Sequence, residues 1–345
     1  MSGETATVEE ATAHAFRRRR LPTGRVFALH VGVVALLFVL QFVLPAYHHA
    51  VFARVMVLAV FAMGYNLLFG YAGLLSLGHA MFFAAGLYGA GLAVYHLGWS
   101  APAGFVAGLA AGLVLSAVIG ALALRTTGVA FMIVTMMFAQ VLYLSTIYFN
   151  VWTGGDQGIV LPQASRTFST FGGSVDLTNS TTRYLLALTL FAAVLAIMLL
   201  LVRSPYGRVL VAIRENEQRT TMLGYDTFAN KLVAVIVSGT VCAAAGAAYA
   251  LLFGYFGSGF ASVQYSILPL LWVLLGGAAT TLGPLVGTLF MYYLIDISND
   301  LLAAWAPGWN FSSIGVVGIA LILLILFFPK GLLGSARERW LPWLP

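Results

Sequence analysis

The chain has 345 residues, of which 61% are hydrophobic and only 8% are charged. A soluble domain carries about 25% charged residues, so this composition excludes an ordinary soluble enzyme and predicts a protein embedded in a lipid membrane. The net charge of +6 is explained by basic loops on one side of that membrane, and we expect no nucleic-acid partner.

Residues 1–25 include a run of four arginines, Arg17–Arg20, before the first apolar segment. A basic start followed by an apolar stretch also describes a cleaved signal peptide. The apolar segment 26–45 is, however, longer than the 7–15 residues typical of a signal. We therefore expect a basic cytoplasmic N-terminal tail over 1–25, a transmembrane domain over 26–335 and a cytoplasmic C-terminal tail over 336–345.

Ten apolar segments approach or reach the length of about 20 residues that a helix needs to cross a bilayer. They are residues 26–45, 51–70, 79–97, 101–124, 129–150, 183–202, 231–253, 265–280, 284–303 and 313–329. The sequence therefore predicts an all-α polytopic membrane protein with about ten transmembrane helices. The single cysteine, Cys242, lies inside the seventh segment, where we expect it to pack in the core.

The distribution of basic residues supports an even number of crossings. With both termini in the cytoplasm, only Arg54, Arg166 and Arg183 of the 17 basic residues fall on the outer side. Cytoplasmic loops of membrane proteins carry the excess of Lys and Arg. The chain is therefore expected to keep both termini in the cytoplasm.

The long outer loop between Asn150 and Arg183 divides the ten segments into five and five. Five helices per half force the second half to run upside down relative to the first, which is the inverted repeat of many transporters. Gly70-Tyr-Ala-Gly73 and Gly254-Tyr-Phe-Gly257 end corresponding segments of the two halves. We predict a five-plus-five inverted repeat.

The sequence lacks several kinds of site, and their absence limits the mechanisms of transport that it could use. All 11 acidic residues lie in loops or near segment ends, whereas an ion-coupled carrier usually keeps a carboxylate inside the membrane. An ion-coupled secondary transporter stays an alternative, because backbone and hydroxyl oxygens can hold sodium. The sequence shows neither the polar stripe expected of a channel nor a Gly-rich phosphate loop or metalloprotease motif. We therefore expect no enzyme activity, cofactor or metal in this chain.

The central loop 203–230 is the one long charged island between apolar segments. Ser204 and Pro205 can begin a helix, residues 207–223 are compatible with one, and Gly224 can end it. We interpret this loop as the surface that couples transport to a separate driving protein. Its candidate residues are Arg208, Arg214, Glu215, Glu217, Arg219, Leu223 and Gly224. The alternative is an ordinary solvated basic loop.

A glycine-rich interruption from Gly70 to Gly78 is the best local candidate for the path of a solute. A helix that restarts near His79 would aim the positive end of its dipole at an anionic group. The alternative is a tight cytoplasmic turn whose small residues allow close helix contact. The candidate path residues are Asn66, Gly70, Gly73, Ser76, Gly78, His79 and Gln140.

Four ordered motifs resemble ABC transporter permeases for branched-chain amino acids, the LivM/LivH-like family. They are Arg203-Ser-Pro-Tyr-Gly-Arg208 with Ala212-Ile-Arg-Glu-Asn-Glu217 and Leu223-Gly224; Gly70-Tyr-Ala-Gly-Leu-Leu-Ser-Leu-Gly-His79; Thr153-Gly-Gly-Asp-Gln-Gly158; and Gly276-Gly-Ala-Ala-Thr-Thr-Leu-Gly-Pro-Leu-Val-Gly287. The resemblance covers residues 50–335. Asn216 and Gln218 depart from the Glu-Ala-Ala pattern of importer permeases in general, which leaves the exact docking residues open.

The resemblance implies an importer in the bacterial inner membrane. A periplasmic binding protein would deliver an amino acid to a pair of permeases, this chain and a second one, as a heterodimer. Two cytoplasmic ABC ATPase subunits would bind ATP and Mg and drive alternating access. Relatives that carry urea or short amides make those solutes the alternative substrates.

Overall fold

A computed structural model describes residues 23–170, 173–305 and 330–339, together with a few separate positions between 315 and 328. Residues 1–22 of the predicted N-terminal tail and 10 of the 17 residues of the tenth predicted segment, 313–329, lie outside the described residues. The C-terminal tail does too, apart from residues 336–339.

Seven helices in the described part of the chain are long and apolar enough to cross a membrane, and two shorter apolar helices follow. The seven are α2 (Thr23–Val43), α3 (Ala46–Asn66) with the π-helical turn η1 (Leu67–Tyr71), α4 (His79–Leu97), α5 (Ala101–Ala123), α6 (Val129–Tyr148), α8 (Ser180–Arg203) and α11 (Thr227–Phe253). The shorter two are α12 (Val263–Gly276) and the apolar part Gly283–Ser298 of α13 (Gly283–Trp305). These nine helices match the first nine predicted segments, with ends that differ by a few residues. The chain is therefore a helical, multi-pass membrane protein.

Short elements connect the long helices. They are α7 (Asn150–Thr153), β1 (Ile159–Val160), η2 (Gln163–Arg166), β2 (Thr167–Thr170), β3 (Gly173–Asp176), α9 (Pro205–Glu215), α10 (Glu217–Met222), β4 (Tyr255–Phe256), η3 (Ser258–Ala261) and α15 (Gly331–Arg339). Strand β1 pairs antiparallel with β4, and β2 pairs antiparallel with β3. These strands lie outside the membrane-spanning helices, so they modify the connecting loops of the predicted all-α fold and not its membrane part.

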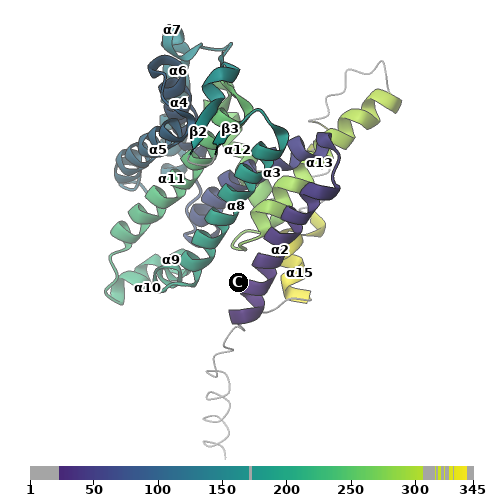
Figure 1. Ribbon diagram of the computed structural model, residues 1–345. Coiled ribbons are helices and arrows are strands. Elements are labelled where there is room, and N and C mark those ends of the chain that lie inside the picture. Colours follow the sequence, from purple (N-terminus) through teal and green to yellow (C-terminus); the bar gives the residue numbers. More distant parts are fainter. Residues whose placement is uncertain are drawn as a thin grey trace, which may run out of the picture.

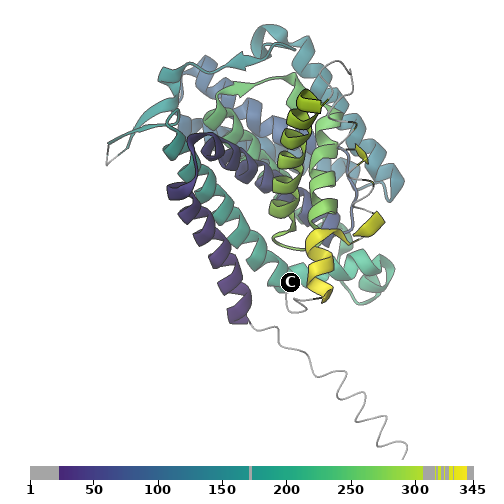
Figure 2. The ribbon, with the colours of Figure 1, turned by 90° about the vertical axis from the view of Figure 1, so that its right-hand side faces the viewer.

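The connecting elements gather at two opposite ends of the molecule (Figure 1). Helices α9, α10 and α15 and the first residues of α2 lie at one end, whereas α7 and the hairpin of β2 and β3 lie at the other. The view from the side gives the same division (Figure 2). We call these the α9–α10 end and the β2–β3 end. The start of α2, the central loop and α15 thus share one end, as the predicted topology requires.

Helix α11 forms the centre of the bundle, where it packs against α3, α4 and α5. Small residues allow this close packing: a Cβ atom built on Gly86 of α4 would lie 2.0 Å from the carbonyl oxygen of Ala243, and one on Gly246 would lie 1.9 Å from that of Phe83. Helices in membranes associate through such small residues, because lipid provides no hydrophobic driving force between them.

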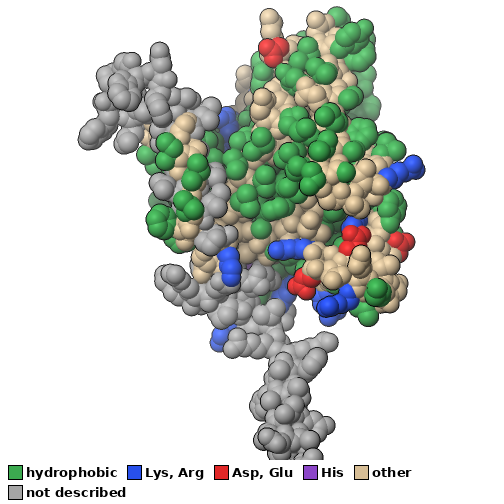
Figure 3. All heavy atoms as spheres, turned by 180° about the vertical axis from the view of Figure 1, so that it is seen from behind, with side chains coloured by type: hydrophobic (Ala, Val, Ile, Leu, Met, Phe, Trp, Pro, Cys, Tyr) green, Lys and Arg blue, Asp and Glu red, His purple; other side chains and the backbone are tan. Residues whose placement is uncertain are grey.

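The surface agrees with a membrane environment. Figure 3 shows a broad field of hydrophobic side chains over the middle of one face, whereas basic and acidic side chains collect at the lower right of that view. Many large apolar side chains are exposed on the long helices, for example Leu113 and Val118 on α5 and Met137 and Val141 on α6. Contiguous apolar surface of this extent is expected to face lipid or a partner.

Candidate functional site

The central loop folds into two short helices joined at Asn216. Ser204 caps α9 by accepting a hydrogen bond from the amide of Gly207 at 3.2 Å, and Pro205 occupies the first turn, as predicted. The prediction of one helix over 207–223 is wrong at Asn216, whose backbone is extended with φ −159° and ψ 101°. Its side-chain oxygen accepts from the amide of Arg219 at 2.9 Å, so this residue ends α9 and caps α10.

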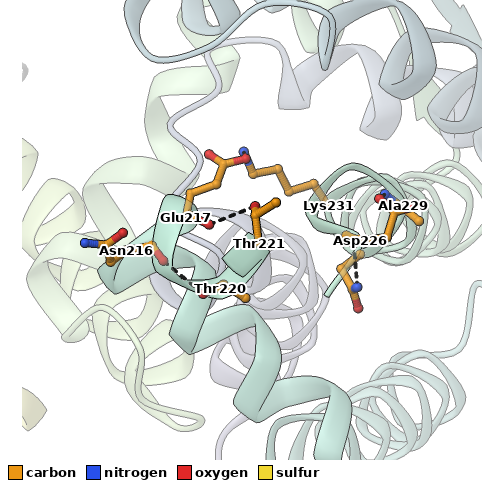
Figure 4. Close-up of polar contacts among 8 residues, drawn as sticks. Asn216, Glu217, Thr220, Thr221, Asp226, Ala229 and Lys231 are labelled. Atoms are coloured by element: carbon orange, nitrogen blue, oxygen red, sulfur yellow. Dashed lines mark hydrogen bonds and ion pairs between the residues drawn. The ribbon is translucent and has the colours of Figure 1, made fainter. Parts of the chain in front are cut away.

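The loop then returns to the membrane through a tight turn. Helix α10 ends before Gly224, which has a φ of +88° that other residues rarely adopt, so Gly224 ends the helix as predicted. Asp226 caps α11 by accepting from the amide of Ala229 at 2.9 Å. Asn216 and Asp226 are the two loop residues in Figure 4 that cap helices. Both helix starts are therefore fixed locally, and the loop keeps a defined shape.

Six of the seven predicted coupling residues are exposed, and Glu217 is half-buried; the six are Arg208, Arg214, Glu215, Arg219, Leu223 and Gly224. Met222 and Leu223 at the tip are 86% and 71% exposed. We call Arg208, Glu215, Arg219, Met222 and Leu223 the α9–α10 surface. An apolar tip surrounded by charges of both signs is typical of a protein-binding surface.

Two of the seven, Glu217 and Arg214, contact other parts of the chain. Glu217 forms an ion pair with Lys231 of α11, which is only 7% exposed (Figure 4). Breaking such a pair is costly in free energy, because removing one partner would leave the other charge buried and uncompensated. It fastens α10 to the first turns of α11. The sequence analysis did not find this pair, because its residues are 14 positions apart and meet only through the turn at Gly224.

Arg214 joins the central loop to the glycine-rich segment. Its guanidinium donates a hydrogen bond to the carbonyl oxygen of Gly70, although much of the side chain stays exposed. Its stem covers Gly73, where a Cβ atom would lie 2.7 Å from the Cγ atom of Arg214. A cavity of about 470 Å³ opens beside this contact, with Gly73, Arg214, Glu215 and Lys231 in its wall. Two sites that the sequence suggested separately are thus in contact.

Asn66 connects the two glycine-rich motifs. Its side-chain oxygen accepts from the amide of Ala279 at 3.0 Å, and its side-chain nitrogen donates to the carbonyl oxygen of Thr280 at 2.8 Å. A Cβ atom on Gly70 would lie 2.1 Å from that side-chain oxygen, so the close approach requires glycine. Ala279 is held at a φ of +57°, a conformation that usually costs a non-glycine residue free energy.

The remaining path candidates on α4 and the segment before it are closely packed. Ser76 and His79 are buried, the amide of Gly78 donates to the Ser76 hydroxyl at 3.2 Å, and His79 Nε2 lies 3.0 Å from the Ser238 hydroxyl. The amide of Ala80, in the first turn of α4, donates to a Ser266 hydroxyl of α12 at 2.9 Å. In this conformation the Ser266 hydroxyl therefore accepts a hydrogen bond from an amide at the start of α4, where the sequence predicted a contact with a solute.

Gln140 lies apart from the other path candidates. It is half-buried on α6, and its side chain makes no hydrogen bond to any of the described residues. Thr135 of the same helix is the residue that meets the glycine-rich segment, because a Cβ atom on Gly78 would lie 2.4 Å from its backbone oxygen. No sequence signal distinguishes Thr135, since the contact is made by its backbone.

The motif Thr153–Gly158 lies at the β2–β3 end, where it packs against the turn after α11. Gly158 approaches the backbone of Phe256, and the Ser258 hydroxyl donates to Asp156 at 3.2 Å. The pairing of β1 with β4 continues this contact. The motif therefore ties the outer loop to the end of α11.

Comparison with known proteins gives a consistent result. The family described as "Branched-chain amino acid transport system / permease component" matches residues 48–327. The high-affinity branched-chain amino acid transport system permease proteins LivM of Salmonella typhimurium and Escherichia coli are each 28% identical over 82% of this chain and 69% of their own length. The autoinducer 2 import system permease protein LsrC of Photorhabdus laumondii is 29% identical over 44% of both chains. No solved structure matches the chain.

Proposed function

The chain belongs to the branched-chain amino acid transport permease family, and from this membership we propose that it carries leucine, isoleucine or valine across the bacterial inner membrane. The permease is not a catalyst, and as a component of a multi-subunit ABC transport system it depends on ATPase and binding-protein partners. The observation that carries the proposal is the family match over residues 48–327, which includes all four glycine-rich and charged motifs.

We assign the docking of the ATPase to the α9–α10 surface. Two cytoplasmic ATPase subunits would each bind one permease, with Met222 and Leu223 entering an apolar groove and Arg208, Glu215 and Arg219 lying at its rim. The exposure of the tip and the caps that fix the loop support this assignment. A second permease chain would complete the transporter as a heterodimer, and a periplasmic binding protein would deliver the solute at the β2–β3 end.

The internal repeat belongs to the same proposal. Ten membrane spans, five in each half, would follow if the residues between 306 and 329 provide the last one. Helices α3 and α11, which occupy corresponding places in the two halves, pack together and run in opposite directions (Figure 1). Gly70 accepts a hydrogen bond from Arg214 of α9, and Gly254 lies beside Arg166, which precedes β2, so the two glycines are at opposite ends, as an inverted repeat would place them.

Uptake by the reconstituted transporter tests the proposed function. The complex, assembled in liposomes with its binding protein outside and ATP inside, should accumulate radiolabelled leucine, whereas urea should give less than about a tenth of that rate. The match to an autoinducer 2 permease makes that solute a necessary competitor in the assay. ATP-driven uptake of urea or autoinducer 2 without a response to leucine, isoleucine or valine would contradict the proposed substrate.

Cysteine labelling tests the orientation. We expect Ser174→Cys, between β2 and α8, to react with an impermeant thiol reagent in intact cells, because the β2–β3 end faces the periplasm. Ser335→Cys in α15 should react only after the cells are opened. Both substitutions are made in a Cys242→Ala background, which removes the buried free cysteine of the chain. Labelling of position 335 in intact cells would reverse the orientation.

A further inference from the structure

The three basic residues that the charge distribution places on the outer side converge in space. Arg54 is on α3, Arg166 precedes β2 and Arg183 is in the first turn of α8, yet all three meet at the last turn of α11. The guanidinium carbon of Arg54 lies 5.2 Å from the centre of the Phe253 ring, and that of Arg183 lies 5.8 Å from it. We call these three residues the arginine triad.

Arg166 is held at this position by the backbone of α11. Its guanidinium donates to the carbonyl oxygens of Leu251 at 3.0 Å and Leu252 at 2.5 Å, which lie at the negative end of the helix dipole. Burial, followed by the nearby positive charge of Arg183, lowers the pKa of Arg166. Arg166 is therefore structural, and it adds positive charge beside Arg183.

Arg54 and Arg183 retain unused donors. Arg183 donates to the carbonyl oxygen of Thr178 at 3.0 Å and Arg54 to the Tyr292 hydroxyl at 3.5 Å, a long contact. The Nε atom of each is buried and has no hydrogen-bond partner among the described residues. Buried donors of a cation are expensive to leave unpaired, so these two point to an acceptor that the described residues do not supply.

The depth of Arg54 strengthens this conclusion. The sequence-based segment 51–70 placed it near a membrane surface, but α3 begins at Ala46, so Arg54 lies eight residues, or about 12 Å, inside the helix. The candidate membrane span Tyr47–Tyr71 includes Arg54, and charges within such spans are costly and are kept for function. Asp176 lies near enough to act on Arg166 through its charge, but among the described residues no carboxylate forms an ion pair with Arg54 or Arg183.

We propose that the arginine triad binds the carboxylate of the transported amino acid as it enters from the β2–β3 end. This inference rests on the proposed function, and it assigns the substrate's anionic group to Arg54 and Arg183. Aromatic rings continue from the triad toward the middle of the membrane: the ring of Phe253 lies 4.7 Å from that of Tyr249, which lies 5.0 Å from Phe260, and Phe260 lies 5.1 Å from Tyr265. An apolar side chain would contact these rings while its carboxylate meets the arginines.

A direct binding measurement tests the site without requiring transport. Isovalerate, an apolar carboxylate, should raise the melting temperature of the purified complex, whereas its uncharged amide should not. Arg54→Met and Arg183→Met should each remove the isovalerate response. Arg125→Met, an equal change at an exposed arginine of the α5–α6 loop, should retain it. Isovalerate responses equal to wild type in the Arg54 and Arg183 variants would overturn the proposal, even if the complex transports another solute.

Uptake kinetics separate the substrate's carboxylate from one on the binding protein. At saturating loaded binding protein, Arg54→Met should lower the maximal leucine uptake at least tenfold. The concentration of binding protein that gives half-maximal ATP hydrolysis should stay within about twofold of wild type. A large rise in that concentration with normal maximal uptake would show that the triad docks the binding protein instead. Arg54→Lys keeps the charge but loses the fork of donors, and we expect it to recover uptake only in part.

Discussion

Replacing Gly78 with valine should abolish uptake by the assembled transporter. A Cβ atom at this position would lie 2.4 Å from the backbone oxygen of Thr135 and 2.9 Å from its carbonyl carbon. Backbone atoms cannot rotate away as the end of a long side chain can, so the start of α4 or helix α6 must shift. Overpacking a core typically costs about 1–3 kcal/mol, and a backbone contact lies at the upper end. We expect uptake below about a tenth of wild type.

The matched control is Gly32→Val in α2. Nothing lies within 4 Å of a Cβ atom built at Gly32, so the same change in volume meets open space there, and uptake should stay near the wild-type rate. Yield and melting temperature of both variants, measured with the uptake, show whether the complex still assembles. A folded Gly78→Val complex with full leucine uptake would show that close contact between the glycine-rich segment and α6 is not needed.

The membrane helices could be predicted from the sequence because their cause is local. A run of apolar residues must form its hydrogen bonds internally in lipid, and this requirement alone makes it a helix. The predicted helix of the central loop is wrong where a polar side chain offers the backbone a different hydrogen-bond partner. Asn216 divides the expected single helix of the central loop because its side chain satisfies an amide of α10.

The contacts that build the candidate site could not be predicted in the same way, because they join distant residues. Asn66 bonds to Ala279 and Thr280 across more than 200 residues, and its chemistry alone does not identify these partners. The motif search still found both glycine-rich segments, since close backbone approach leaves glycine as its sequence signal.

The members of the arginine triad could be identified from the sequence, but their proximity could not. The charge distribution isolated Arg54, Arg166 and Arg183 as exceptions to the positive-inside rule, but a one-dimensional count cannot show that they meet. Their convergence depends on how α3 and α8 pack together and on the position of α11, which ends between them. Three residues that violate a topological rule separately thus form one cluster in the fold.

Reversing the charge of Glu217 should uncouple the transporter. Lysine at this position would face Lys231, so the ion pair that fastens α10 to α11 becomes a repulsion. The side chains of Lys231 and Glu217 are 9% and 43% exposed, so solvent weakens the effect relative to a fully buried pair. We expect the free energy of unfolding to fall by about 1–3 kcal/mol, between the values for exposed and buried pairs. Because α10 carries the tip of the α9–α10 surface, leucine uptake per ATP hydrolysed should fall at least tenfold.

The second charge reversal makes this prediction specific. Lys231→Glu combined with Glu217→Lys restores an opposite pair in the same place, and it should recover most of the lost stability and coupling. Glu215→Lys makes the same charge change at an exposed position and should leave the free energy of unfolding unchanged. The measurements are thermal unfolding of the complex and the ratio of leucine uptake to ATP hydrolysis in liposomes. If the double variant is no better than Glu217→Lys alone, Glu217 acts through contact with the ATPase, and its pairing with Lys231 is not what positions α10.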